Sequence, residues 1–292
     1  MTIRQTMKTP GWAAMLLLAL LSALSLAGCA GQSQLKPVRE FAAQAEHLDS
    51  FADLTLRYRD TTARELPYLA PAAAEAERNA DATRQAAAGD FLNIQKSVAL
   101  YMRTLGRLAG EEQYDVSGQF DALSSGIQAW PGNGLDPSHT TAYAALTRLV
   151  ASAATASAQN AAVQSLVSDA DAPLQSLLEA MGALLRYYDK IDSNEKKIVL
   201  GFFDIEIPFA NTPRERLLST LAKAQRQEKT QEYARAERRL WLARKHLDNI
   251  AAAHSRLAAY VAQPASAEAQ QAIAASNRAI RANLAELEAN PR

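Results

Sequence analysis

The sequence has little of several things that usually define a function. It contains one cysteine in 292 residues, so no disulfide within the chain can stabilise the fold. The 31 basic and 31 acidic residues balance, which removes the electrostatic case for nucleic-acid binding, because such binding needs a basic face that releases counterions. Aromatic residues make up only 7% of the chain, and alanine supplies much of its 48% hydrophobic fraction. This composition favours closely packed helices.

Catalytic motifs are also missing from the sequence. No HExxH, Walker loop, dinucleotide-binding glycine pattern or GxSxG elbow occurs. The four histidines are His47, His139, His246 and His254, and the last two would lie about 12 Å apart along one helix, too far to share a metal ion. His254 falls on an apolar helix face and is interpreted as a hydrogen-bonded core residue. We therefore expect a protein without enzymatic activity, metal or cofactor.

The N-terminal segment carries the strongest signal in the chain. Arg4 and Lys8 precede an apolar run from 12 to 26, which ends in Leu26-Ala27-Gly28-Cys29, and this is the order of a secretory signal. The segment resembles the lipobox of bacterial lipoproteins. The resemblance implies that a lipoprotein signal peptidase recognises Leu26, Ala27 and Gly28 and cuts before Cys29. It also implies that the Cys29 sulfur takes a diacylglycerol and that the new amine is acylated, for example with palmitate.

The same resemblance implies a location. In Gram-negative lipoproteins an aspartate after the lipidated cysteine favours retention in the inner membrane, and here that residue is Ala30. We therefore expect a signal peptide over 1–28, a lipidated cysteine with a short tether over 29–37, and one helical domain over 38–292. The protein would be anchored in the outer membrane and would face the periplasm. Without Arg4 and Lys8 the mature chain has 29 basic and 31 acidic residues, a net charge near −2.

Hydrophobic periodicity predicts an elongated antiparallel all-α bundle with two long helices and several shorter ones. One apolar seam with steps of three and four runs from Leu146 to Tyr188, includes Asn160 as its one polar member, and crosses Pro173, where we expect a kink or a restart. A second long helix is predicted to begin at Thr212-Pro213-Arg214-Glu215 as a capping box. Its stretch 225–239 is nearly free of large apolar residues, which favours a solvated rod over a surface that binds a partner.

Shorter helices complete the predicted bundle. The first covers 38–55, an alanine-rich helix ends at Gly89, and Asp90 caps the next helix. A short helix over 116–127 precedes a turn at 130–134, and the last helix follows Ser266. Because seams of this kind close either within one chain or between chains, the oligomeric state stays open.

One segment between the two long helices stands out by its hydrophobicity. In 198–209 every residue except Gly201, Asp204 and Glu206 is apolar, and Lys196 and Lys197 precede it. Gly201 and Pro208 both disfavour a regular helix. One interpretation is a strap that buries one face on the end of the bundle. The other is a contact surface for a partner or an anionic membrane, formed by Lys196, Lys197, Ile198, Leu200, Phe202, Phe203, Ile205 and Phe209.

Three functional hypotheses follow. The leading one is a non-enzymatic outer-membrane lipoprotein whose bundle binds a protein or another envelope component. The second is a membrane-active bundle that inserts segment 198–209, and the third is a small-ligand sensor with a pocket between helices.

Overall fold

The computed structural model describes residues 34–110, 126–154, 160–210 and 212–290. The signal peptide, Cys29 with the lipobox residues Leu26, Ala27 and Gly28, and most of the helix predicted over 116–127 lie outside these residues. Within them the protein is an all-α bundle without a β-strand, as predicted. A single isolated bridge between Trp130 and Leu135 closes a turn.

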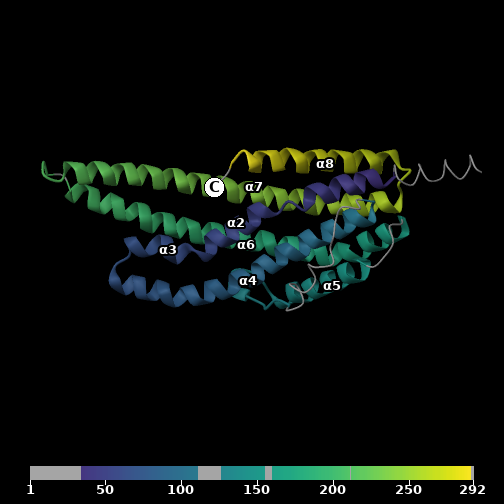
Figure 1. Cartoon of the computed structure of the whole chain (residues 1–292), viewed down its shortest axis with the longest axis horizontal. Helices are drawn as coiled ribbons and strands as arrows, with labels where there is room; N and C mark the ends of the chain where they lie inside the picture. The colour runs from purple at the N-terminus through teal and green to yellow at the C-terminus, as the bar shows by residue number, and fades with distance from the viewer. Residues whose placement is uncertain (1–33, 111–125, 155–159, 211, 291–292) are drawn as a thin grey trace, which may run out of the picture.

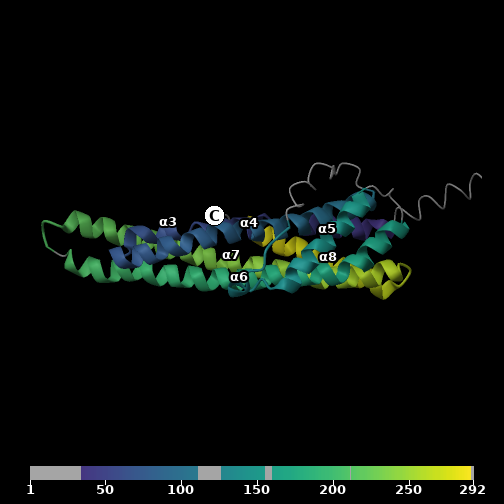
Figure 2. The ribbon, with the colours of Figure 1, turned by 90° about the horizontal axis from the view of Figure 1, so that it is seen from below.

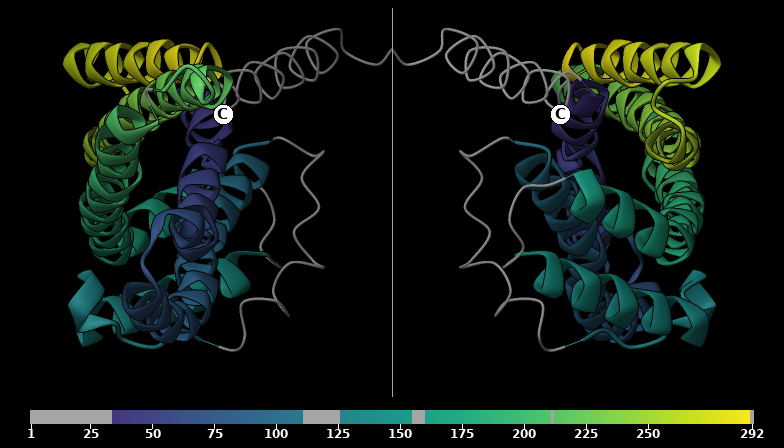
Figure 3. Two further views of the ribbon diagram at one scale, coloured as in Figure 1. Left: turned by 90° about the vertical axis from the view of Figure 1, so that its left-hand side faces the viewer. Right: turned by 90° about the vertical axis from the view of Figure 1, so that its right-hand side faces the viewer.

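The helices line up along one long axis, so the molecule is a rod (Figures 1 and 2). A first helix covers 34–45. The elements that follow are α2 (Asp49–Arg59), α3 (Thr61–Glu65), the 3-10 turn η1 (Leu66–Tyr68), α4 (Pro71–Leu108), the 3-10 turn η4 (Pro131–Asn133), α5 (Pro137–Ala154), α6 (Asn160–Phe209), α7 (Arg216–Ala262) and α8 (Ala267–Glu288). Viewed along the rod, α8 lies at one edge of the cross-section and α4 and α5 lie at the other (Figure 3).

The predicted seam from Leu146 to Tyr188 is divided between two helices. Leu146 and Ala153 are buried on α5, and Val163, Leu177 and Tyr188 are buried on α6. However, α5 and α6 lie side by side and pack against each other (Figure 1). The seam therefore belongs to two helices, and α6 does not restart at Pro173 as expected. A periodic stripe is compatible with both arrangements, because two neighbouring helices can turn the same kind of apolar face toward one core. Asn160 is exposed at the start of α6 and is not a buried register residue.

Two positions that were expected to interrupt helices lie inside them. Pro173 is within α6, and α4 continues through Gly89. Both sites are flanked by buried residues, Leu174 at 0% exposure and Ala88 at 1%. Packing of this kind outweighs an intrinsic cost of about 1 kcal/mol for glycine and about 3 kcal/mol for proline. Asp90 does not cap a helix; its carboxylate accepts hydrogen bonds from Trp130 Nε1 at 2.7 Å and from a backbone N–H.

The first predicted helix is broken at 46–48, and it begins earlier than expected. Residues 34–37, which were assigned to the tether, are helical. They are also held in place, because the Tyr260 hydroxyl donates to the carbonyl oxygen of Gln34 at 2.7 Å and Asn277 donates to that of Pro37 at 3.1 Å. The chain therefore enters the rod beside the end of α7.

Several local predictions are confirmed. The turn at 130–134 is present, with Gly134 in the left-handed region at φ 88°. Ser266 caps α8 by accepting the N–H of Ala269. His254 is fully buried in the core, where Nε2 lies 2.7 Å from the Tyr101 hydroxyl and Nδ1 lies 2.9 Å from Asp171.

Candidate functional site

Segment 198–209 is the end of α6, so the prediction that it forms an extended strap was wrong. The helical period divides its side chains between two faces. Val199 and Phe203 point inward at 0% and 6% exposure, whereas Phe202, Ile205 and Phe209 point outward at 36%, 62% and 79%. Gly201 has open space around its Cα, and Pro208 lies in the last turn. A helix is tolerated here because the inner face packs and the proline comes close to the helix end.

The start of α7 adds a second group of exposed apolar residues that sequence reasoning missed. Leu217, Leu218 and Leu221 are 73%, 58% and 59% exposed. The helix begins at Arg216 and not at Thr212. The two side chains of the predicted capping box bond to each other and not to backbone N–H groups. The Thr212 hydroxyl donates to Glu215 Oε2 at 2.7 Å. In the sequence the three leucines look like one face of an ordinary amphipathic helix. Only the fold shows that they are exposed, because no described element covers them.

We call residues 196–210 and 212–226 the hairpin tip. Figures 1 and 2 show it at the end of the rod where α6 and α7 project past the other helices. The last element that supports it is η1, whose Tyr68 ring lies 5.5 Å from the rings of both Phe202 and Phe203. Beneath these rings, Val199, Phe203 and Tyr233 form a small buried cluster.

The eight residues predicted as a contact surface therefore differ in their environments. Ile198 and Leu200 are half-buried, and Phe203 is buried. Lys196 lies 3.7 Å from Glu237, and Lys197 is exposed. The exposed apolar part of the prediction consists of Phe202, Ile205 and Phe209.

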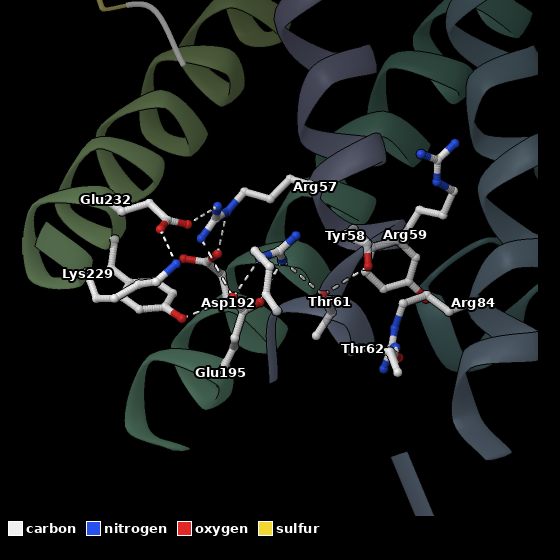
Figure 4. Close-up of polar contacts among 12 residues, drawn as sticks. Arg57, Tyr58, Arg59, Thr61, Thr62, Arg84, Asp192, Glu195, Lys229 and Glu232 are labelled. Carbon is white, nitrogen blue, oxygen red and sulfur yellow. Dashed lines mark hydrogen bonds and ion pairs between the residues drawn. The ribbon is translucent and has the colours of Figure 1, made fainter. Parts of the chain in front are cut away.

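A polar network stabilises the base of the hairpin formed by α6 and α7, where these helices lie beside α2 and α3 (Figure 4). Arg57 of α2 bonds Asp192 of α6 at 2.7 Å and Glu232 of α7 at 2.8 Å. Arg64 of α3 makes a two-bond pair with Glu195, at 2.7 and 2.6 Å, and Glu195 is fully buried. Charge-assisted pairs with two parallel bonds are strong and fix geometry. They join α2 and α3 to both arms of the hairpin.

The same network corrects the interpretation of 225–239 as a solvated rod. Tyr233 is 1% exposed and donates its hydroxyl hydrogen bond to Glu195 at 3.0 Å. Ala236 is also buried, and Arg239 pairs with Asp53 of α2 at 2.8 Å. Only the outer face of this stretch is solvated, while its inner face is fixed to α2 and α6.

Burial changes the acid–base properties of this region. Burial, together with the nearby carboxylates of Glu77 and Glu195, raises the pKa of Glu65 to about 7. Burial opposes the charge of Arg57, but Asp192, Glu232 and Glu195 overcome it and raise the pKa of that guanidinium. Glu65 therefore titrates near neutral pH. Burial also raises the pKa of Asp192 in the same region.

A groove of about 440 Å³ lies between α2 and α7 beside this network. Its walls carry five arginines, namely Arg57, Arg59, Arg64, Arg235 and Arg239. All of them except Arg235 are paired with carboxylates at 2.6 to 2.8 Å. Four of the five charges are therefore already balanced within the protein, so the groove joins helices and presents, among its described residues, only Arg235 as a free cation to an anionic ligand.

The described residues offer neither a metal site nor a membrane-spanning helix. No group of three or more His, Cys, Asp and Glu side chains there is arranged to hold a metal ion. Burial lowers the pKa of His246 to about 4, and this histidine is 1% exposed. Among the described helices, none combines the length and the apolar character needed to cross a bilayer.

No protein family, curated protein or solved structure matched this chain. The site is thus defined by its own geometry, a supported hairpin with an uncovered apolar end.

Proposed function

We propose that this protein is a non-enzymatic lipoprotein, anchored through Cys29 in the outer membrane, whose hairpin tip binds a protein or another envelope component. One observation carries the proposal. Seven large apolar side chains are exposed on the described residues, and six of them, all except Trp241, belong to the hairpin tip. Full burial of one such side chain is worth about 1.5 to 3 kcal/mol, so a cluster left uncovered on a stable rod indicates a binding surface.

The position of the tip supports the same proposal. The chain enters the rod next to Tyr260, near the end of α7, and the tip contains the start of α7 at Arg216. At about 1.5 Å per residue, α7 separates these two points by about 65 Å. A lipid at Cys29 would hold the first end at the membrane, so an upright rod presents the tip well away from it.

Site-specific photocrosslinking in living cells tests the proposal. A photoreactive residue at Phe209 or Leu217 is expected to capture one reproducible envelope component, because both side chains are more than half exposed at the tip. The matched control is the same residue at Trp241, which is 44% exposed but lies outside the tip. Equal products from positions 209, 217 and 241 would argue against a specific tip surface.

The anchor has a separate test. Intact-mass spectrometry of native protein is expected to show a chain that begins at Cys29 and carries a diacylglycerol and an acyl group. The Cys29→Ser variant should carry neither lipid group and should keep residues 1–28. An unmodified thiol in the native protein would refute the anchor while leaving the tip to be judged by crosslinking.

A further inference from the structure

We propose that the component bound by the hairpin tip is an anionic phospholipid surface other than the membrane patch that holds the anchor. The protein would then connect two lipid surfaces through the length of its rod. This inference rests on the proposed function, because it names the partner of the same tip and requires the anchor at the opposite end.

The first argument is charge. The hairpin tip contains six basic and three acidic residues, a net charge of +3, whereas the whole chain has 31 basic and 31 acidic residues. Four of these cations make no ion pair with another described residue, namely Lys197, Arg214, Arg216 and Lys223, and all four are exposed. By contrast, the acidic Asp204 is paired with Arg226 at 2.7 Å. Each lysine or arginine near an anionic membrane surface strengthens binding about fivefold.

The second argument is the depth of the apolar cluster. Phe209 and Leu217 lie at the extremity, next to the connection between the two helices. From there the exposed apolar residues reach back to Phe202 on α6 and Leu221 on α7. At about 1.5 Å per residue these distances are about 10 Å and about 6 Å. Interfacial helices bury their apolar faces by about 5 to 10 Å, so the cluster matches the depth of the headgroup and upper acyl region.

The third argument is the position of the free cations relative to that depth. Lys223 follows Leu221 by about 3 Å along α7, which places it at headgroup level when the leucines are inserted. Arg216 lies at the extremity, and its long side chain can extend back toward the phosphates while its methylene groups stay in the apolar region. The same charge distribution disfavours a second copy of this chain as the partner, because two tips would each bring a net charge of +3.

Vesicle capture tests this inference with the native lipidated protein. The protein is reconstituted by its anchor into vesicles of phosphatidylcholine, and retention in this donor population is checked by flotation. Labelled acceptor vesicles contain either phosphatidylcholine alone or phosphatidylcholine mixed with phosphatidylglycerol. We expect capture of the anionic acceptors only, and we expect it to weaken as salt is raised, because the free cations are exposed.

Variants separate the two parts of the mechanism. Phe209→Asp should lower capture about tenfold or more, because it replaces the most exposed apolar side chain with a repelled charge. Lys223→Gln should lower capture about fivefold, which is the factor for one interfacial cation. Trp241→Ser, an exposed apolar position outside the tip, should leave capture unchanged. Circular dichroism checks that each variant remains folded.

Specific outcomes would overturn the inference. Equal capture of neutral and anionic acceptors would refute the role of the cations, and full capture by Phe209→Asp would refute the role of the tip. If acceptors are not captured although the donors hold the protein, the lipid partner is refuted. A single envelope protein crosslinked at Phe209 in cells would in that case preserve the proposed function with a protein as the partner.

Discussion

The base and the end of the α6–α7 hairpin contrast sharply, although they are parts of the same two helices. At the base, Arg64, Glu195 and Tyr233 satisfy one another across three elements. About four turns further along α6, Phe209 contacts solvent with 79% of its surface. The difference shows that the two helices are held by polar contacts at the base and leave apolar side chains exposed at the end. A rigid base allows an apolar end to remain exposed without collapsing onto the bundle.

The largest expected loss of stability follows from removing the central carboxylate of the base, that of Glu195. Glu195→Ala would leave Arg64 paired with no carboxylate and would remove the acceptor of the Tyr233 hydroxyl. Loss of one partner from a buried pair costs about 3 to 5 kcal/mol, and the partial exposure of Arg64 places the expected loss near the lower value. Urea unfolding measures it. Glu206→Ala, an exposed carboxylate at the tip, is the control and should change stability by less than about 0.5 kcal/mol.

Two phenylalanines of α6, the buried Phe203 and the exposed Phe209, test the same difference between base and end. Phe203→Ala removes a ring that is 6% exposed and is expected to cost about 3 kcal/mol of unfolding free energy. Phe209→Ala removes a ring that is mostly in water and should stay within about 0.5 kcal/mol of the native protein. Thermal or urea unfolding compares them directly. Similar losses in both variants would mean that the tip is packed in solution.

The smallest expected effect depends on pH and lies at the base. The pKa of Glu65 is raised in the folded protein from its ordinary value of 4.5 to about 7, mainly by burial. Between these values the folded state binds more protons than the unfolded chain, so stability should fall as pH rises from about 4.5 to above 7. Allowing for relaxation of the site, we expect a loss of about 2 kcal/mol.

Glu65→Gln isolates that contribution. The variant keeps the size of the side chain but cannot ionise, so it should be more stable than the native protein at pH 8 and similar at pH 4. Urea midpoints measured at both pH values give the comparison. A variant that follows the native pH profile would show that Glu65 is not the titrating group.

The sequence predicts the helices better than their connections. Periodicity places Leu146 and Leu177 on buried faces, but the same period continues from α5 into α6 and hides that these are two helices packed side by side. Local rules also predict helix breaks at Gly89 and Pro173 that the structure does not have. Long-range packing supplies more free energy than either residue costs in a helix. The fold class depends on the periodic pattern, whereas connectivity depends on contacts that the pattern does not encode.

The candidate site was predicted only in part for the same reason. Phe202, Ile205 and Phe209 belong to an unusual apolar run and were recognised. Leu217, Leu218 and Leu221 are exposed because α6 and α7 extend past η1, a difference in length that no local window contains. The network at the base joins residues such as Arg64 and Glu195, which are separated by 131 positions. Such pairs become visible only when the fold is known.

The short length of α8 has a practical consequence. This helix ends at Glu288, where the neighbouring Glu286 lies 3.4 Å from Arg238 and 3.5 Å from Lys245, near the middle of α7. Helix α8 therefore ends near the middle of the long axis of the rod (Figure 1). A fluorescent protein fused behind it would leave both extremities free, so microscopy of such a fusion would follow the molecule without blocking either proposed attachment.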